Sequence, residues 1–113
     1  MDIYERINKS IMKKAKAKLY WLVKEKRIPP IIDAEDRRLN RAYCPIIVFK
    51  NQVENGHYWS SVISNNSITG KESIAELSYL VDSVPVENLK VDSKFELFEG
   101  RTKVAIGKII EVI

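Results

Sequence analysis

The last third of the chain alternates apolar and polar residues on both sides of a Glu-Gly turn. Two runs, Lys94–Phe98 and Lys103–Val112, flank Glu99-Gly100. Such alternation turns every second side chain to the same face of a strand, and glycine permits a tight reversal between two strands. Gly107 lies inside the second run, where a glycine indicates a bulge or a close backbone approach. The segment therefore predicts an antiparallel hairpin with one buried face.

Residues 43–93 also have the composition of strands and turns. Val, Ile, Tyr, Trp and Phe gather in short runs, and Asn, Gly and Pro lie between the runs. No segment long enough for a crossover helix separates the runs, as a parallel sheet would require. The pattern predicts a small antiparallel β-barrel, so the fold class is mainly β. The predicted strands are Cys44–Lys50, His57–Ser64, Ile74–Val81, Lys94–Phe98 and Lys103–Val112.

The first 28 residues differ from the rest in charge. They hold nine Lys or Arg against three acids, whereas residues 29–113 hold ten against twelve. Apolar residues recur at three- and four-residue steps from Ile3 to Arg27, a spacing that lines one face of a helix. Asp2 is a suitable N-cap, and Pro29 after Ile28 ends the pattern. We therefore expect a basic amphipathic N-terminal α-helix over residues 1–28 that flanks the barrel.

Residues 29–42 are polar and charged, and they fit either a short second helix or a connecting arm. A chain of 113 residues is long enough for one domain with its own core. We expect a single domain over residues 1–113, made of the basic helix 1–28, the arm 29–42 and the β-barrel 43–113.

Composition restricts where the protein resides. No apolar run approaches the roughly 20 residues of a transmembrane helix, so no membrane span is expected. The first residues include Asp2 and Glu5, whereas a signal peptide begins without acids. Cys44 is the single cysteine, which excludes an intrachain disulfide and agrees with a reducing compartment. We expect a cytoplasmic protein.

Catalytic patterns are weak in this sequence. It lacks a Gly-x-x-x-x-Gly-Lys-Ser/Thr loop, which excludes GTP hydrolysis of that type. His57 is the single histidine, and its ordinary role would be packing at a strand edge rather than activating Cys44 or Ser60. Cys44 precedes Pro45 in an apolar run and is expected to be a buried structural thiol. We therefore expect no enzyme activity, no cofactor, no metal and no small-molecule substrate.

The end of the chain resembles a known family. In the third domain of bacterial elongation factor Tu, the barrel closes with a Phe, an aliphatic residue, a Glu-Gly turn, a Val and a Gly. The matching positions here are Phe95, Leu97, Glu99, Gly100, Val104 and Gly107. Cys44-Pro45-Ile46-Ile47-Val48-Phe49 is similar to the Pro-initiated first strand of that domain, and Val84-Pro85-Val86 to the lead into the loop before the hairpin. The resemblance spans residues 43–113 and implies an elongation factor Tu domain III-like C-terminal β-barrel and a setting in translation. One departure is Phe98, which stands where the family has Arg.

Recognition remains as the expected activity, and two surfaces are candidates. The basic helix carries lysines and aromatics that could meet phosphates. The strand that begins at His57 carries aromatics that could stack on a base or anchor a protein. Arg101, at the tip of the hairpin, is a third candidate contact. The predicted contact residues are Lys13, Lys14, Lys16, Lys18, Tyr20, Trp21, His57, Tyr58 and Arg101.

Two function classes fit these features. The leading hypothesis is a non-catalytic intracellular module that binds a protein or RNA partner, because the resemblance implies translation and the charge asymmetry permits RNA. The alternative is an immunity or antitoxin-like protein that neutralises a toxin enzyme by covering its site. A membrane-surface role for the basic helix ranks below both, since its apolar face is needed to cover the barrel.

Overall fold

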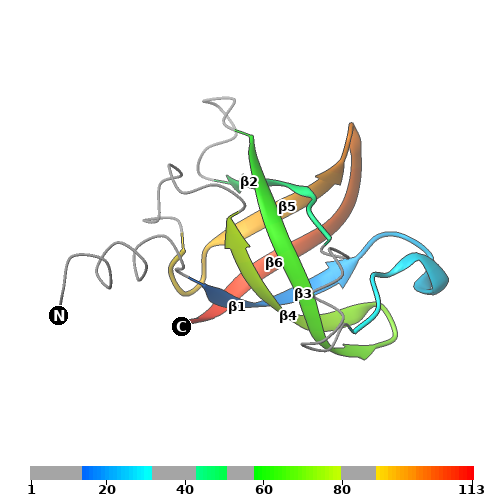
Figure 1. The fold of residues 1–113 in the computed structure, drawn as a ribbon, viewed down its shortest axis with the longest axis horizontal. Coiled ribbons are helices and arrows are strands. Elements are labelled where there is room, and N and C mark those ends of the chain that lie inside the picture. The colour runs from blue at the N-terminus through cyan, green and yellow to red at the C-terminus, as the bar shows by residue number, and fades with distance from the viewer. Residues whose placement is uncertain (1–13, 32–42, 51–57, 80–88) are drawn as a thin grey trace, which may run out of the picture.

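The computed structural model describes residues 14–31, 43–50, 58–79 and 89–113. In these residues six strands form a closed antiparallel barrel in the order β1-β4-β3-β2-β5-β6, and β6 pairs with β1 (Figure 1). Mainly β structure and a small barrel were predicted, and both are confirmed. The elements are β1 (Ala15–Trp21), η1 (Glu25–Arg27, a 3-10 turn), β2 (Ile46–Phe49), β3 (Trp59–Thr69), β4 (Glu72–Tyr79), β5 (Lys94–Glu99) and β6 (Thr102–Val112).

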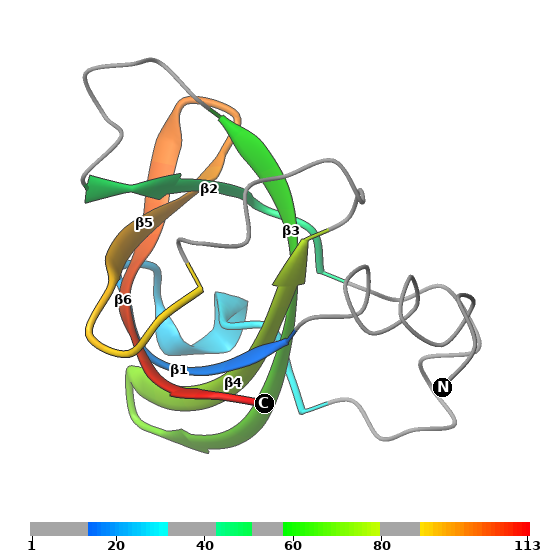
Figure 2. The ribbon, with the colours of Figure 1, turned by 90° about the vertical axis from the view of Figure 1, so that its left-hand side faces the viewer.

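The strand order contains a Greek key. β2, β3 and β4 follow one another in the sheet, and β5 returns to pair with β2, which gives the spatial order β5-β2-β3-β4. β6 and β1 then join β5 to β4, so the ring is complete (Figure 2). Every described strand therefore has two neighbours, although β3 pairs with β2 only over Trp59 and Ser60.

The predicted helix over residues 1–28 is wrong for its described part, because residues 15–21 form β1. Ala15 and Leu19 are four residues apart, a step that fits one face of either a helix or a strand. Ala17 and Trp21 are also fully buried, while Lys18 and Tyr20 are exposed. Burial of every second residue is the period of a strand, not of a helix. The described residues contain no α-helix, and residues 1–13 and most of the predicted arm lie outside them.

Most predicted strand positions in the other segments are confirmed. The largest difference is β3, which was predicted to end at Ser64 but continues to Thr69, so only Gly70 and Lys71 separate it from β4. Gly70 and Gly100 have φ values of 62° and 60°, and both occupy two-residue turns between paired strands. Glycine takes this left-handed conformation at little cost, which explains both reversals.

Three irregularities bend the strands around the barrel. The β3–β4 ladder shifts register between Asn65 and Ser67, and β6 shifts against both of its neighbours, near Val104 and near Ile110. A bulge increases the local twist and bends its strand.

The described barrel interior is mostly apolar, and a chain of hydrogen-bonded polar side chains lies near one end. Phe49 meets Phe95 edge to face at 5.7 Å between ring centroids, next to Tyr79. Toward the end of β1, the Trp21 indole Nε1 donates to Ser73 Oγ at 2.9 Å, and Ser73 Oγ donates to Asn65 Oδ1 at 2.8 Å.

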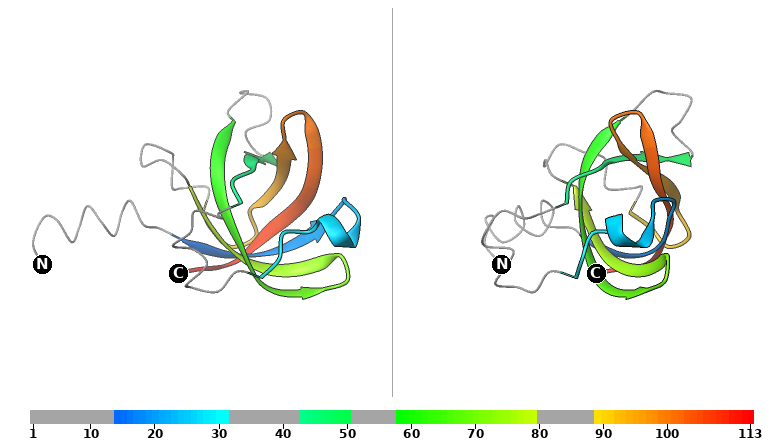
Figure 3. Two further views of the ribbon diagram at one scale, coloured as in Figure 1. Left: turned by 45° about the vertical axis from the view of Figure 1, so that its right-hand side comes forward. Right: turned by 90° about the vertical axis from the view of Figure 1, so that its right-hand side faces the viewer.

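Asn65 extends this chain beyond the strands. Its Nδ2 donates to the Pro29 carbonyl at 2.7 Å and so ties the segment after η1 to the barrel. η1 itself lies beside the β3–β4 turn, since a Cβ on Gly70 would be 3.8 Å from Glu25 Oε1 (Figure 3). One polar chain therefore links β1, β4, β3 and the segment that follows η1.

Candidate functional site

Three lysines stand side by side on the outer wall of the barrel. In the strand register, Lys94 of β5 lies opposite Lys108 of β6, and Lys108 lies opposite Lys18 of β1. All three are exposed. Neighbouring strands are about 4.8 Å apart, so the three lysine positions span roughly 10 Å across the wall. Like charges in direct opposition destabilise a sheet, so packing alone does not favour this row.

The row borders a groove of about 340 Å³. Lys50, which directly follows β2, also lines the groove, and its neighbour Phe49 pairs with Phe95 next to Lys94. A second hollow shares Lys50 and Lys94 and continues past Lys90 to Asp92. We use "lysine groove" for the first hollow; its main lining residues are Lys18, Tyr20, Lys50, Lys94, Ile106 and Lys108.

Three of the described lysines outside the groove have acidic partners. Lys14 lies 3.9 Å from Glu76, Lys16 lies 3.8 Å from Glu111, and Lys103 pairs with Glu96 at 2.5 Å.

Of the four groove lysines, three lack an acidic partner among the described residues. Within the described ranges, no carboxylate lies within 4.0 Å of the ammonium group of Lys18, Lys50 or Lys94. Lys108 has one partner, Asp92, at 3.7 Å, and the Asp92 side chain is 78% exposed. An exposed pair of this kind contributes little, so the positive charge of the groove is mostly uncompensated.

A second row of side chains runs parallel to the lysines, two residues away from them on each strand. Tyr20 of β1 lies opposite Ile106 of β6, and both are exposed, at 44% and 42%. Glu96 flanks this pair on the β5 side and Glu72 on the β4 side. The groove therefore combines a basic row, an apolar pair and an acid beside the aromatic ring. It has the features of a site for an anion that also carries a flat or apolar part.

The predicted contact residues separate in the structure. Lys18 and Tyr20 lie in the lysine groove, whereas Lys14 and Lys16 are in ion pairs away from it. Trp21 is fully buried in the core, against Tyr43 at 5.9 Å between ring centroids.

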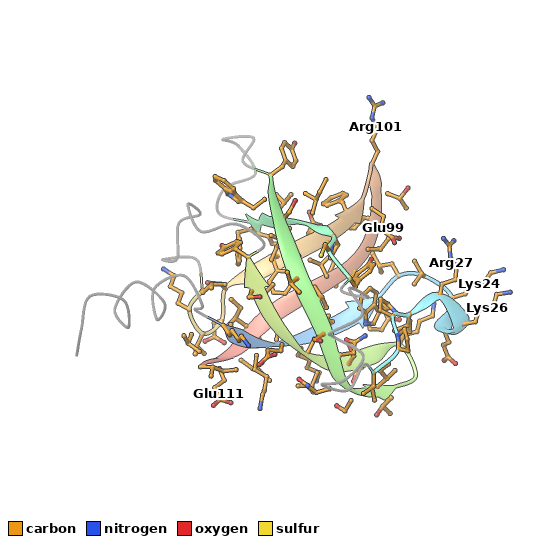
Figure 4. The ribbon with its side chains drawn as sticks, in the orientation of Figure 1. Lys24, Lys26, Arg27, Glu99, Arg101 and Glu111 are labelled. Atoms are coloured by element: carbon orange, nitrogen blue, oxygen red, sulfur yellow. The ribbon has the colours of Figure 1, made fainter. Side chains whose placement is uncertain are left out.

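The remaining predicted contacts are scattered. Tyr58 is 67% exposed just before β3. Arg101 projects from the tip of the β5–β6 hairpin, beyond Glu99 (Figure 4). Lys13 and His57 lie outside the described residues. No single surface of the described barrel therefore gathers the predicted contacts.

Sequence reasoning missed Lys50, Lys94 and Lys108. A signal was present for all three, because each is a polar residue in a run that was predicted as a strand. Alternation gives the face on which a side chain lies, but only the register shows that Lys94, Lys108 and Lys18 are neighbours.

Cys44, Tyr43 and the acidic side chains are the other groups with possible chemistry. Cys44 was expected to be buried but is exposed; the residue that packs inside is Pro45. Burial raises the pKa of the Tyr43 hydroxyl, and the adjacent Glu99 carboxylate raises it further by its charge and by accepting a hydrogen bond. In the described ranges, no three His, Cys, Asp or Glu side chains gather as a metal site.

A second basic cluster lies at η1. Lys24, Lys26 and Arg27 all extend outward from this short turn (Figure 4). Glu25 lies among them, and none of the four is buried.

No family model matches this chain, and no curated protein matches it. No helical segment in the described ranges has the length and apolar character that crossing a membrane requires.

Proposed function

We propose that this protein is a non-catalytic module that binds RNA through the lysine groove. The observation that carries the proposal is the row of Lys94, Lys108 and Lys18 on adjacent strands, extended by Lys50 and mostly without acidic partners. Phosphate contacts of this kind supply affinity that does not depend on sequence.

Three arguments favour RNA over other anions. The groove pairs positive charge with an exposed aromatic ring, the combination that proteins use for single-stranded nucleic acid. The net charge of +4 attracts a polyanion at long range. The resemblance of residues 43–113 to the third domain of elongation factor Tu favours a partner in translation, and it is the reason for choosing RNA over DNA.

The proposal is tested by the salt dependence of binding. A short labelled single-stranded RNA is titrated with the full chain at several salt concentrations. Four phosphate contacts predict a slope of log K against log salt of about −3, since each contributes about −0.7 on a single strand. The double variant Lys18→Gln/Lys94→Gln should weaken binding and bring the slope to about −1.4.

A matched control removes the same charge elsewhere. Lys14→Gln/Lys16→Gln also removes two positive charges, but both lysines pair with acids outside the groove, Glu76 and Glu111. It should change the slope much less. Equal losses in the two double variants would show that net charge, rather than the groove, drives binding. Absence of RNA binding at low salt would overturn the proposal.

A further inference from the structure

We infer that the lysine groove takes single-stranded RNA in one orientation, with the sugar-phosphate backbone along the lysine row and a base on the ring of Tyr20. The inference rests on the proposed function and deepens it, because it assigns the form of the RNA and the part of a nucleotide that each side of the groove contacts.

The distance between the lysine row and the apolar pair supports this orientation of the RNA. Lys18 and Tyr20 are two residues apart on β1, as are Lys108 and Ile106 on β6. At about 3.4 Å per residue the rows are roughly 7 Å apart on the barrel surface. A nucleotide has its phosphate and its base on opposite sides of one ribose. The basic row and the apolar pair are therefore placed to contact the two ends of the same nucleotide.

The acidic residues beside the groove determine which row contacts the phosphate and which contacts the base. Glu72 and Glu96 flank the apolar pair, whereas the lysine row has one exposed acid, Asp92, near Lys108. A phosphate placed over Tyr20 would meet Glu72, whereas Glu96 beside Ile106 is paired with Lys103. Like charges repel, so the phosphates are directed to the lysine row and the base to the apolar pair.

A base-paired duplex does not fit this arrangement. Its bases are stacked on one another, so no base face is free for Tyr20, and an A-form helix is recognised through shape and contacts across its minor groove. The lysines form one row across adjacent strands, which follows one backbone. Single strands, loops and ends present unstacked bases and meet both requirements.

Glu72 adds a preference among the bases. It lies opposite Tyr20 in the β1–β4 register, and no described lysine or arginine lies within 4.0 Å of its carboxylate. A carboxylate accepts hydrogen bonds from the amino groups of cytosine and adenine, whereas uracil presents a carbonyl oxygen at the corresponding position. A base on Tyr20 is therefore expected to be adenine or cytosine in preference to uracil.

Equilibrium binding to four RNAs of one length tests the inference: oligo(A), oligo(C), oligo(U) and a mixed-sequence duplex. We expect the wild-type chain to bind oligo(A) and oligo(C) more tightly than oligo(U), and the duplex most weakly. Tyr20→Leu, which keeps an apolar side chain but removes the ring, should weaken single-strand binding about tenfold. Its salt slope should stay unchanged, because no phosphate contact is lost.

Two further variants separate stacking from folding. Tyr20→Phe keeps the ring and should retain wild-type affinity. If Tyr20→Leu weakens binding only because it disturbs the fold, its unfolding midpoint should be lower than those of the wild type and of Tyr20→Phe. Glu72→Gln should reduce the preference for oligo(A) and oligo(C) over oligo(U), since the amide is a weaker acceptor than the carboxylate.

Failure of the inference is distinguishable from failure of the proposed function. If the duplex binds as tightly as single strands and Tyr20→Leu has no effect, while Lys18→Gln/Lys94→Gln still weakens both, the orientation is wrong and RNA binding stands. If none of the four RNAs binds at low salt, the proposed function and the inference both fall.

Discussion

Gly107 lies directly opposite Phe95 in the β5–β6 ladder, and the Phe95 ring fills the space that a side chain at residue 107 would need. A Cβ built on Gly107 overlaps Phe95 Cζ and would also be 2.6 Å from Leu19 Cδ2 on the other side. Leu19 is opposite Gly107 in the β1–β6 ladder. The sequence predicted a bulge or close approach at this glycine, and close approach is what the structure has.

Replacing Gly107 with Ala is therefore expected to destabilise the barrel. Overpacking a core by one carbon costs about 1–3 kcal/mol. This outweighs the roughly 0.4–1 kcal/mol that Gly→Ala gains by restricting the unfolded chain. The free energy of unfolding, measured by urea denaturation, should fall for Gly107→Ala.

A double-mutant cycle with Phe95 tests the cause. Phe95→Leu alone opens a cavity and destabilises the core. If the two side chains compete for one space, the double variant Gly107→Ala/Phe95→Leu should lose less free energy of unfolding than the two single variants lose together. Strict additivity would mean that residue 107 does not press against the ring.

Removal of the Ser73 hydroxyl should also destabilise the protein. Ser73 Oγ accepts from Trp21 Nε1 and donates to Asn65 Oδ1, and all three residues are buried. Ser73→Ala would leave two buried polar atoms without this partner, at about 1–3 kcal/mol each. We expect a loss of at least about 2 kcal/mol in the free energy of unfolding. Ser60→Ala, at an exposed position of β3, is the control and should change it by less than about 0.5 kcal/mol.

The raised pKa of Tyr43 predicts a loss of stability at high pH. Below about pH 10 the phenol is protonated in both the folded and the unfolded chain. Above it the unfolded chain releases the proton while the folded chain keeps it, so unfolding becomes more favourable as the pH rises. Urea midpoints of wild type and Tyr43→Phe should diverge only above about pH 10, with the wild type falling faster. Parallel curves would contradict the role of Tyr43.

Much of the barrel could be predicted because its strands alternate clearly. Phe95 and Leu97 are buried and Lys94 is exposed, as alternation requires, and Gly100 takes the positive φ of a tight turn. These features depend on neighbours in sequence, which a single chain displays directly.

β1 could not be predicted as a strand from the same rules. The spacing of Ala15 and Leu19 satisfies both periods, and the apolar residues that precede them in the sequence extend the helical pattern. What selects the strand is pairing with β4 and β6, which lie more than fifty residues away in sequence. Tertiary contacts of that range override local propensity.

The lysine groove depends on register for the same reason. Residues 18, 94 and 108 become neighbours only when β1, β6 and β5 pair at the observed offsets. A shift of one residue would turn Lys108 toward the interior.

The lysine row should lower the stability of the barrel, which gives the last prediction. Lys18 faces Lys108 and has no acid within 4.0 Å among the described residues, whereas Lys16, two residues earlier on β1, pairs with Glu111. Lys18→Gln should raise the free energy of unfolding by about 0.2–1 kcal/mol at low salt, and the gain should shrink as salt screens the repulsion. Lys16→Gln should leave it unchanged or lower it slightly, because an exposed attractive pair is lost. If Lys18→Gln destabilised the protein at low salt, the lysine row would stabilise the fold. Folding alone would then explain the row, and the row would no longer support a role in binding.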